Sequence, residues 1–137
     1  MGYVMETGIT KIKLVIYRDR GVIVGDTPFF SLVVDGFEKA CREAGYEMVL
    51  FNLDRRAEDY QKQVDNLLLD SSTAIVLYGS ELTDEEAVVF RKARTPFLML
   101  DYWNHDMSFA GVFINNADAA RMAGEYLINK GLREIRY

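Results

Sequence analysis

The sequence has a single cysteine and a single histidine, and both scarcities exclude whole classes of site. A lone thiol, Cys41, cannot form a disulfide within the chain, and it falls at an apolar helical position where a small buried side chain is expected. Together with His105 it cannot supply the clustered nitrogen and sulfur ligands of a zinc site. We therefore expect no metal, no cofactor and a reducing, cytoplasmic setting.

Positive charge and long apolar runs are also scarce. The 16 Lys and Arg residues are outnumbered by 21 Asp and Glu residues, so the formal net charge of −5 offers no basic footprint to a phosphate backbone. No stretch approaches the roughly 18 apolar residues that span a bilayer, and residues 1–6 lack the basic start and apolar run of a signal peptide. We expect this chain by itself to bind neither DNA nor a membrane.

The motifs of phosphate binding and nucleophilic catalysis are missing as well. The first loop has Gly21 and Gly25, but it forms neither the G-x-G-x-x-G fingerprint of dinucleotide binding nor the G-K-[ST] ending of a P-loop. No G-x-S-x-G motif occurs. Cys41 is predicted on a buried helix face, where its thiol could not reach a substrate as a nucleophile must. The sequence thus predicts that the chain is not an enzyme.

Half of the 137 residues are apolar, which is enough for one hydrophobic core and too few for two full domains. Short apolar runs with many β-branched residues predict buried strands. They cover residues 12–17, 49–53, 74–78, 97–100 and 112–114. Residues 134–137 begin another strand and then stop, so we expect the chain to be an incomplete piece.

Segments with helical spacing lie between these runs. The first begins near Pro28, ends at Gly45 and carries an apolar stripe predicted to face a sheet. That stripe consists of Val33, Phe37, Ala40, Cys41 and Ala44. A second helix covers about residues 57–70. The spacing of Thr83 and Glu86 predicts a capping box that starts a third helix, which runs to about residue 93.

A fourth helix is predicted to begin after Asn116 and to end at Gly131. Its apolar residues are spaced to lie on one face, which we expect to be buried. That face consists of Met122, Ala123, Tyr126 and Leu127.

Strands that alternate with helices predict right-handed crossovers and an α/β fold, in which an open parallel sheet has helices on both faces. In such three-layer sheets, ligands bind at the carboxyl ends of the strands, because loops and helix N-termini present backbone N–H groups there. The residues that follow each strand are therefore the candidates for a site.

Two features at this edge could bind a ligand. Phe29 and Phe30 open the first helix. Either both pack in the core or, since adjacent helical side chains point about 100° apart, one faces the crevice and stacks on a sugar or base. Asp101 follows an apolar strand, where its carboxylate could accept hydrogen bonds from two ligand hydroxyls or cap a turn instead. Trp103 could line the same crevice or cover the end of the sheet.

Other polar residues at this edge favour structural roles. Asn115 and Asn116 are expected to cap the fourth helix rather than to contact a ligand. The charged residues at 18–20 and 54–56 are expected on solvated loop faces.

Several segments follow a shared pattern. Residues 26–30 read D-T-P-F-F, residues 36–46 run from G-F-E-K-A to a G-Y ending, and residues 96–101 read P-F-L-M-L-D. Further on come N-N at 115–116, A-G-E-Y-L at 123–127 and K-G-L-R-E-I at 130–135. In this order and at this spacing, the segments resemble the N-P-F-F, G-Y, P-x-x-x-x-D, D-N, A-x-x-x-x-L and G-H-R-x-I motifs of the lactose-repressor (LacI/GalR) family.

This resemblance implies one lobe of a type I periplasmic-binding-protein-like fold. In the family, two such lobes bind a sugar, nucleoside or similar small effector between them, and an upstream helix-turn-helix binds operator DNA as part of a homodimer. The resemblance implies a flexible segment at 1–8, the amino-terminal lobe at 9–132 and the start of a truncated second lobe at 133–137. The ligand-binding residues that it implies are Thr27, Phe29, Phe30, Gly79, Ser80, Asp101 and Trp103.

Two departures from the family pattern bear on these expectations. Thr27 stands where the family often has Asn and offers a hydroxyl in place of an amide, which changes the donor pattern toward an effector. Leu132 stands where a His is usual. Because one lobe supplies only half of the effector contacts, we expect this chain alone to bind small molecules weakly, and we expect it to self-associate.

Two other classes of protein stay open at this point. A signalling receiver domain also alternates strands and helices, and Asp54 and Asp101 could serve as its carboxylates. It would need an acidic pair after the first strand and a Lys after Asp101, and the sequence has neither. The other class is the sugar-binding lobe of a transport system, which the missing signal peptide disfavours.

Overall fold

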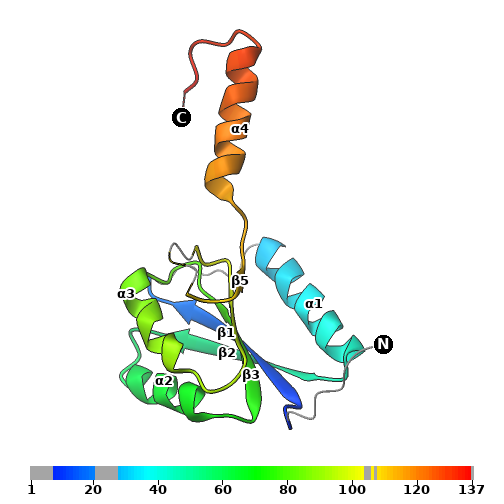
Figure 1. Ribbon diagram of the computed structural model, residues 1–137, viewed down its shortest axis with the longest axis vertical. Helices are drawn as coiled ribbons and strands as arrows, with labels where there is room; N and C mark the ends of the chain where they lie inside the picture. The colour runs from blue at the N-terminus through cyan, green and yellow to red at the C-terminus, as the bar shows by residue number, and fades with distance from the viewer. Residues whose placement is uncertain (1–7, 21–27, 104–105, 107, 137) are drawn as a thin grey trace.

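The computed structural model describes residues 8–20, 28–103, 106 and 108–136, and its centre is a five-stranded sheet (Figure 1). The strands lie in the order β2-β1-β3-β4-β5, and every neighbouring pair is parallel. Their bounds are β1 Lys11–Arg18, β2 Glu47–Asp54, β3 Thr73–Tyr78, β4 Phe97–Leu100 and β5 Gly111–Val112. The predicted open parallel sheet is confirmed.

Helices pack on both faces of this sheet. Helix α1 (Pro28–Glu43) lies on one face, while α2 (Tyr60–Leu69) and α3 (Asp84–Ala87) lie on the other (Figure 1). The third predicted helix is α-helical for one turn only and continues as a 3-10 helix, η2 (Val88–Lys92). The β-branched pair Val88 and Val89 lowers the preference for a longer α-helix at this point.

The two faces of the sheet have separate apolar clusters. Under α2 and α3, side chains such as Val15, Leu77 and Met99 are almost completely buried. Under α1, Leu14 and Ile16 pack with Phe30 and Tyr78, whose rings meet edge to face at 5.5 Å between centroids. Alternate residues of each strand thus point to opposite layers, as the side-chain period of a strand requires.

The inward face of α1 differs from the predicted stripe. Phe30, Val34, Phe37 and Cys41 face the sheet, whereas the predicted stripe residues Ala40 and Ala44 are exposed. The observed residues are spaced by four, three and four positions, so they also lie along one side of a helix. The larger rings of Phe30 and Phe37 fill the space next to the sheet, and the small alanines turn outward.

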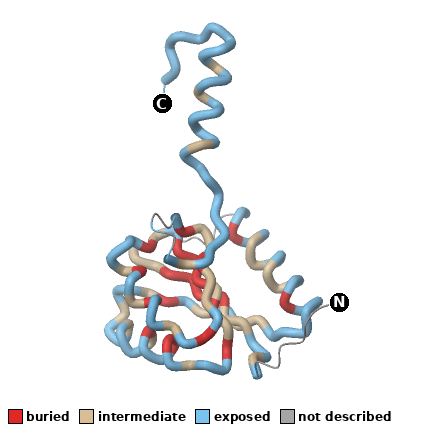
Figure 2. The backbone as a smooth tube through the Cα atoms, in the orientation of Figure 1, coloured by how far each residue is buried: buried red, intermediate tan, exposed pale blue. Residues whose placement is uncertain are grey.

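Helix α4 (Asn116–Asn129) projects beyond the carboxyl edge of the sheet, and none of its residues is buried (Figure 2). The expectation that Met122, Ala123, Tyr126 and Leu127 are buried is therefore wrong for this conformation. Met122 and Tyr126 are 60% and 62% exposed. The reason is the course of the chain after β5, which runs on past the sheet edge instead of turning back over it.

The strand predicted at the end of the chain is also absent from the described residues 134–136. A strand needs a neighbour to pair with, and this segment follows α4 away from the sheet (Figure 1). Within the part of the chain that the structure describes, none of the helices combines the length and apolar composition that a membrane crossing requires.

Candidate functional site

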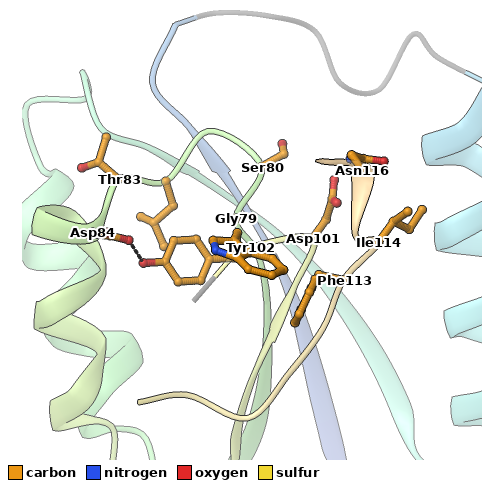
Figure 3. A pocket seen from close by; sticks show the side chains of 11 residues that line it. Gly79, Ser80, Thr83, Asp84, Asp101, Tyr102, Phe113, Ile114 and Asn116 are labelled. Carbon is orange, nitrogen blue, oxygen red and sulfur yellow. Dashed lines mark hydrogen bonds between the residues drawn. The ribbon is translucent and has the colours of Figure 1, made fainter. Parts of the chain in front are cut away.

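A pocket of about 490 Å³ opens at the carboxyl edge of the sheet, within the size range of small-molecule sites (Figure 3). The loops after β3 and β4 form two of its walls, and the segment after β5 forms the third. The residues that line it are Gly79, Ser80, Leu82, Thr83, Asp84, Asp101, Tyr102, Trp103, Phe113, Ile114 and Asn116. Four of the seven predicted site residues are in this set, namely Gly79, Ser80, Asp101 and Trp103.

Asp101 follows β4 directly and has a left-handed backbone conformation, with φ at +55°. Asp is among the residues that adopt this conformation most readily. Its N–H donates to the carbonyl oxygen of Val112 at 2.8 Å, which ties the turn to β5. The Tyr78 hydroxyl donates to its carboxylate Oδ2 at 3.1 Å. This leaves Oδ1 at the pocket with no hydrogen bond from another described side chain.

Tyr78 links the carboxylate of Asp101 to the α1 layer of the core. Its ring packs against Phe30, and its hydroxyl reaches Asp101. Burial, with a further contribution from the Asp101 charge, raises the pKa of Tyr78. The phenol therefore stays protonated around neutral pH and serves as a fixed hydrogen-bond donor to Asp101.

Tyr102 anchors the loop that carries Asp101 and Trp103. It is buried, and its hydroxyl donates to the carboxylate of Asp84, the first residue of α3 (Figure 3). Burial and the neighbouring Asp84 raise the pKa of Tyr102, so the donor is retained. Farther along the same loop, the carboxylate of Asp106 accepts a hydrogen bond at 2.6 Å from Arg91, a residue of η2. These contacts hold the loop against α3 and η2.

Trp103 and Phe113 form an aromatic pair on one side of the pocket. Their ring centroids are 4.7 Å apart and their planes are nearly perpendicular, at 82°. Both rings remain partly exposed, at 46% and 37%. Such rings can stack on the apolar face of a ligand. Phe113 belongs to an apolar run that predicts a strand, so its place in the pocket wall is not among the predictions from the sequence.

Gly79 allows the close approach of the two loops. A Cβ at this position would lie 3.3 Å from the Tyr102 Cβ and 3.4 Å from the Leu82 Cβ. The Gly79 N–H donates to the carbonyl oxygen of Leu100 at 2.9 Å, which aligns the ends of β3 and β4. Ser80 is exposed at the rim of the pocket (Figure 3), and its side chain is within hydrogen-bonding reach of Tyr78.

The remaining predicted site residues are not in this pocket. Phe30 is buried in the core against Tyr78, so the expectation that its ring contacts a ligand is not supported. Phe29 is half exposed at the start of α1 and does not line the pocket. Thr27 lies outside the described residues.

Helix caps account for two of the polar residues at this edge. The predicted capping box is present, with Thr83 N–H donating to Glu86 at 3.0 Å and Glu86 N–H donating to the Thr83 hydroxyl at 3.4 Å. Asn115 caps α4 by accepting from the Asp118 N–H at 3.1 Å. Its neighbour Asn116 lines the pocket, which the sequence had favoured as a cap only.

A charged cluster next to the pocket fixes the start of the first loop. The Glu81 carboxylate accepts from the backbone N–H groups of Asp19 and Arg20, at 2.7 and 3.1 Å. Arg55 pairs with Glu86 at 2.7 Å and approaches Asp19 at 3.5 Å. Arg55 is half exposed, as expected for a residue on a solvated loop. Its contacts with both Asp19 and Glu86 were not predicted from the sequence.

The side chains that could contact a ligand at this edge carry carboxylates, hydroxyls, an amide and aromatic rings. Among the residues that the structure describes, no group of three or more His, Cys, Asp or Glu side chains is arranged to hold a metal ion. The pocket can therefore offer hydrogen bonds from Ser80 and Asn116, hydrogen-bond acceptance by Asp101 and stacking by the rings.

A family model described as "Periplasmic binding proteins and sugar binding domain of LacI family" matches residues 10–136. The HTH-type transcriptional repressor PurR of Vibrio parahaemolyticus serotype O3:K6 (strain RIMD 2210633) is 30% identical over 139 residues, which covers 98% of this chain and 41% of that protein. Its counterpart in Glaesserella parasuis serovar 5 is 26% identical over 126 residues, 90% of this chain and 37% of the relative. The chain thus spans about two fifths of the relatives it matches.

Solved structures show the same fold. The transcription regulator CcpA of Lactococcus lactis aligns with a TM-score of 0.68 and 22% identity, over 93% of this chain and 45% of that one. The LacI family regulator CcpA of Weissella paramesenteroides, solved with bound glucose, aligns with a TM-score of 0.60 and 20% identity, over 85% and 41% of the two chains. Because the family model spans nearly the whole chain and the fold agrees, the chain belongs to the family of periplasmic binding proteins and sugar-binding domains of LacI regulators.

Proposed function

We propose that this chain is the effector-sensing lobe of a transcriptional regulator and that its carboxyl-edge pocket binds one side of a small hydroxylated molecule, of the sugar or nucleoside class. The observation that carries this proposal is the meeting of the Asp101 carboxylate with the Trp103 and Phe113 rings in a single pocket. Regulation of transcription is also the role named for the relatives.

The chemistry of the pocket suits such a molecule. A carboxylate accepts hydrogen bonds from neighbouring hydroxyls, and bonds of this charged kind are stronger than those between neutral groups. Aromatic rings stack on the apolar face of a sugar or on a base. A related regulator with the same fold was solved with glucose bound, which supports a hydroxylated ligand. We assign ligand contacts to Gly79, Ser80, Asp101 and Trp103, and we keep Thr27 and Phe29 as proposed ligand-binding residues.

The proposed regulation depends on parts that lie outside this chain. Residues 9–132 form the amino-terminal lobe, 1–8 precede it, and 133–137 lead toward a second lobe. Effector contacts from both lobes favour a closed state, and this shift changes the geometry of a homodimer on operator DNA. The DNA contacts come from a helix-turn-helix region, which the relatives' description as HTH-type supports. Such a regulator works in the cytoplasm.

The regulator is favoured over the two other classes. Membership of this family argues against a receiver domain, whose phosphorylation chemistry the strand ends also lack. The family description includes periplasmic binding proteins, so a transport lobe shares the fold. The relatives found here are repressors, and this favours the regulator.

The test is a titration of the chain with a panel of monosaccharides, disaccharides and nucleosides. Binding is measured as a change in the fluorescence of Trp103, the only tryptophan in the sequence. Asp101→Asn is expected to weaken binding by roughly tenfold or more, since hydrogen bonds to charged groups contribute about 1.5–3 kcal/mol. Asp54→Asn is the matched control, because Asp54 ends β2 at the same edge but lies outside the pocket. Equal losses in both variants, or binding that is indifferent to Asp101, would contradict the proposal.

A further inference from the structure

Arg18 has a buried hydrogen-bond donor that lacks an acceptor. It is the last residue of β1, at the carboxyl edge of the sheet, and its side chain is only partly exposed. Its Nε atom is buried, and no atom of the described chain accepts a hydrogen bond from it. A buried N–H without an acceptor is unfavourable and rare in folded proteins. An acceptor supplied by a ligand would remove this cost.

Acidic side chains close to Arg18 in the fold are engaged with other groups. Asp54 is opposite Arg18 in the register of β1 and β2, but its carboxylate accepts from the N–H of Arg56 at 2.9 Å and lies 3.6 Å from the guanidinium of that residue. Glu81 accepts from the backbone N–H groups of the two residues that follow Arg18. Within the described part of the chain, no ion pair neutralises the Arg18 charge.

Arg18 lies beside the wall of the pocket that carries Ser80. Strands β1 and β3 are neighbours, with Ile16 opposite Tyr78, and Arg18 and Ser80 each come two residues later in the chain. Alternate residues of a strand point to the same side, so Arg18 is on the face of Ile16, which clusters with Tyr78. The Ser80 side chain is within hydrogen-bonding reach of Tyr78 as well. The contact of Glu81 with the backbone after Arg18 keeps the two strand ends together.

The start of α1 adds positive potential on the same side of the sheet. The N-terminus of α1 lies at the carboxyl edge, and Phe30 in its first turn packs against Tyr78 (Figure 1). The helix dipole places partial positive charge at this end, and the first turn contains no acidic residue that would offset it. The dipole therefore reinforces the charge of Arg18.

Arg18 and Asp101 are far enough apart to bind opposite ends of one small molecule. Strand β3 lies between β1 and β4, and neighbouring strands are about 4.8 Å apart, so the ends of β1 and β4 are separated by roughly 10 Å. A negatively charged group next to Asp101 would be repelled by the carboxylate, whereas hydroxyls there can donate to it. The edge thus offers an acceptor at one end and a cation at the other.

We propose that Arg18 binds an oxyanion carried by the effector, either a phosphate monoester or a carboxylate, while Asp101 accepts from the hydroxyls of the same molecule. The ligand is then a sugar or nucleoside with a negative charge at one end. This inference rests on the proposed function, because Asp101 places the hydroxylated end. The guanidinium presents parallel N–H groups, the Nε–H among them, that match two oxygens of either group.

Paired titrations of the nitrogen-15-labelled chain test the role of Arg18. Glucose is compared with glucose 6-phosphate and glucuronate, and adenosine is compared with adenosine 5′-monophosphate. The indole N–H of Trp103 reports occupation of the pocket, and the Nε–H of Arg18 reports contact with the oxyanion. We expect a charged probe to shift both resonances and to bind about tenfold or more tightly than its neutral counterpart. The phosphate and carboxylate probes distinguish the two kinds of oxyanion.

Variants separate the Arg18 contact from a general attraction between charges. Arg18→Gln is expected to abolish the preference for the charged probe, and Arg18→Lys, which keeps the charge without the planar fork, is expected to retain part of it. Arg20→Gln is the matched control, because it removes the same charge from an exposed residue two positions later. This control is expected to keep the preference.

The possible failures of this inference and of the proposed function give different results. If charged and neutral probes bind equally and both shift the Trp103 resonance, the role of Arg18 is overturned and the proposed function stands. An equal loss of preference in Arg20→Gln and Arg18→Gln would also overturn the role of Arg18. If no probe shifts the Trp103 resonance, both proposals are contradicted.

Discussion

Asp101 has two separable roles at the scale of the single residue. Its backbone is in the left-handed region, and its carboxylate accepts the Tyr78 hydroxyl at the wall of the pocket. The first role requires a residue that tolerates positive φ, and the second requires an acceptor. Substitutions can therefore separate the stability of the turn from the chemistry of the site.

Asp101→Ala is expected to lower the free energy of unfolding by about 1–2 kcal/mol relative to Asp101→Asn, because Asn tolerates the left-handed conformation and Ala does not. Urea unfolding of both variants measures the difference. Asp101→Gly, which removes the backbone strain without restoring a side chain, serves as the control and should unfold close to Asp101→Asn. If Ala proves as stable as Asn, the turn imposes no such constraint.

Two glycines offer a matched comparison of crowding. Gly79→Ala is expected to destabilise the protein by about 1 kcal/mol, because the new Cβ meets Tyr102 and Leu82 in the pocket wall. Gly36→Ala, in the middle of α1 with open space around it, is expected to stabilise by about 0.5–1 kcal/mol through the better helix propensity of alanine. Thermal or urea unfolding compares the stability of the two variants. If both substitutions change stability in the same direction, the crowding of Gly79 by Tyr102 and Leu82 is contradicted.

The sequence predicted some site residues well and others poorly, for physical reasons. Asp101 and Gly79 follow apolar strands, and the carboxyl ends of parallel strands meet at one edge, so strand prediction sufficed to place them. Phe30 is different because only the packing of α1 decides which of two adjacent rings turns inward. Phe113 belongs to an apolar run that predicts a strand, and nothing local shows that β5 ends at Val112.

At the scale of elements, Asp70 joins three parts of the fold. It follows α2, and its carboxylate accepts from Ser72 next to β3 and from the Lys13 ammonium of β1 at 3.0 Å. The hydrogen bonds from Ser72, with those of Lys13 and Thr73, hold the pKa of Asp70 well below its ordinary value of 3.8. A lowered pKa in the folded state means that the charged carboxylate stabilises the fold.

This stabilisation is fully present above the ordinary pKa and is lost as the pH falls below about 4. Asp70→Asn is expected to cost about 1–3 kcal/mol at pH 7, and its difference from the original chain should shrink in acid. Urea unfolding at pH 7 and pH 3 measures both effects. Asp65→Asn, an exposed carboxylate on the same helix, is the control and should change little at either pH. A penalty for Asp70→Asn that is the same at both pH values would contradict this role.

The element pattern itself was largely accessible from the sequence. The strands and the first three helices lie close to the predicted ranges, because apolar periodicity and caps such as Thr83 are local signals. The position of α4 could not be predicted from the sequence. Its apolar residues indicate that the helix packs against something, but they do not show which surface that is. The same holds for residues 134–136, which need a neighbouring strand that local sequence cannot supply.

At the scale of the whole molecule, the fold brings the ends of β3, β4 and β5 together and leaves one side of the pocket open. That open side is where a second lobe would complete the contacts to an effector in the proposed function. A single lobe is then expected to bind weakly, at millimolar ligand concentrations, while it still selects the position at which the ligand sits.

The most direct test of this account is a nuclear magnetic resonance titration of the nitrogen-15-labelled chain with the sugar and nucleoside panel. The indole N–H of Trp103 gives a single resonance, because the chain has no other tryptophan. We expect a binding ligand to shift this resonance together with the amides of Gly79, Ser80, Asp101 and Asn116, and to leave the amides of α2 unmoved. Shifts that cluster away from the carboxyl edge, or an indole resonance that stays fixed with every member of the panel, would contradict it.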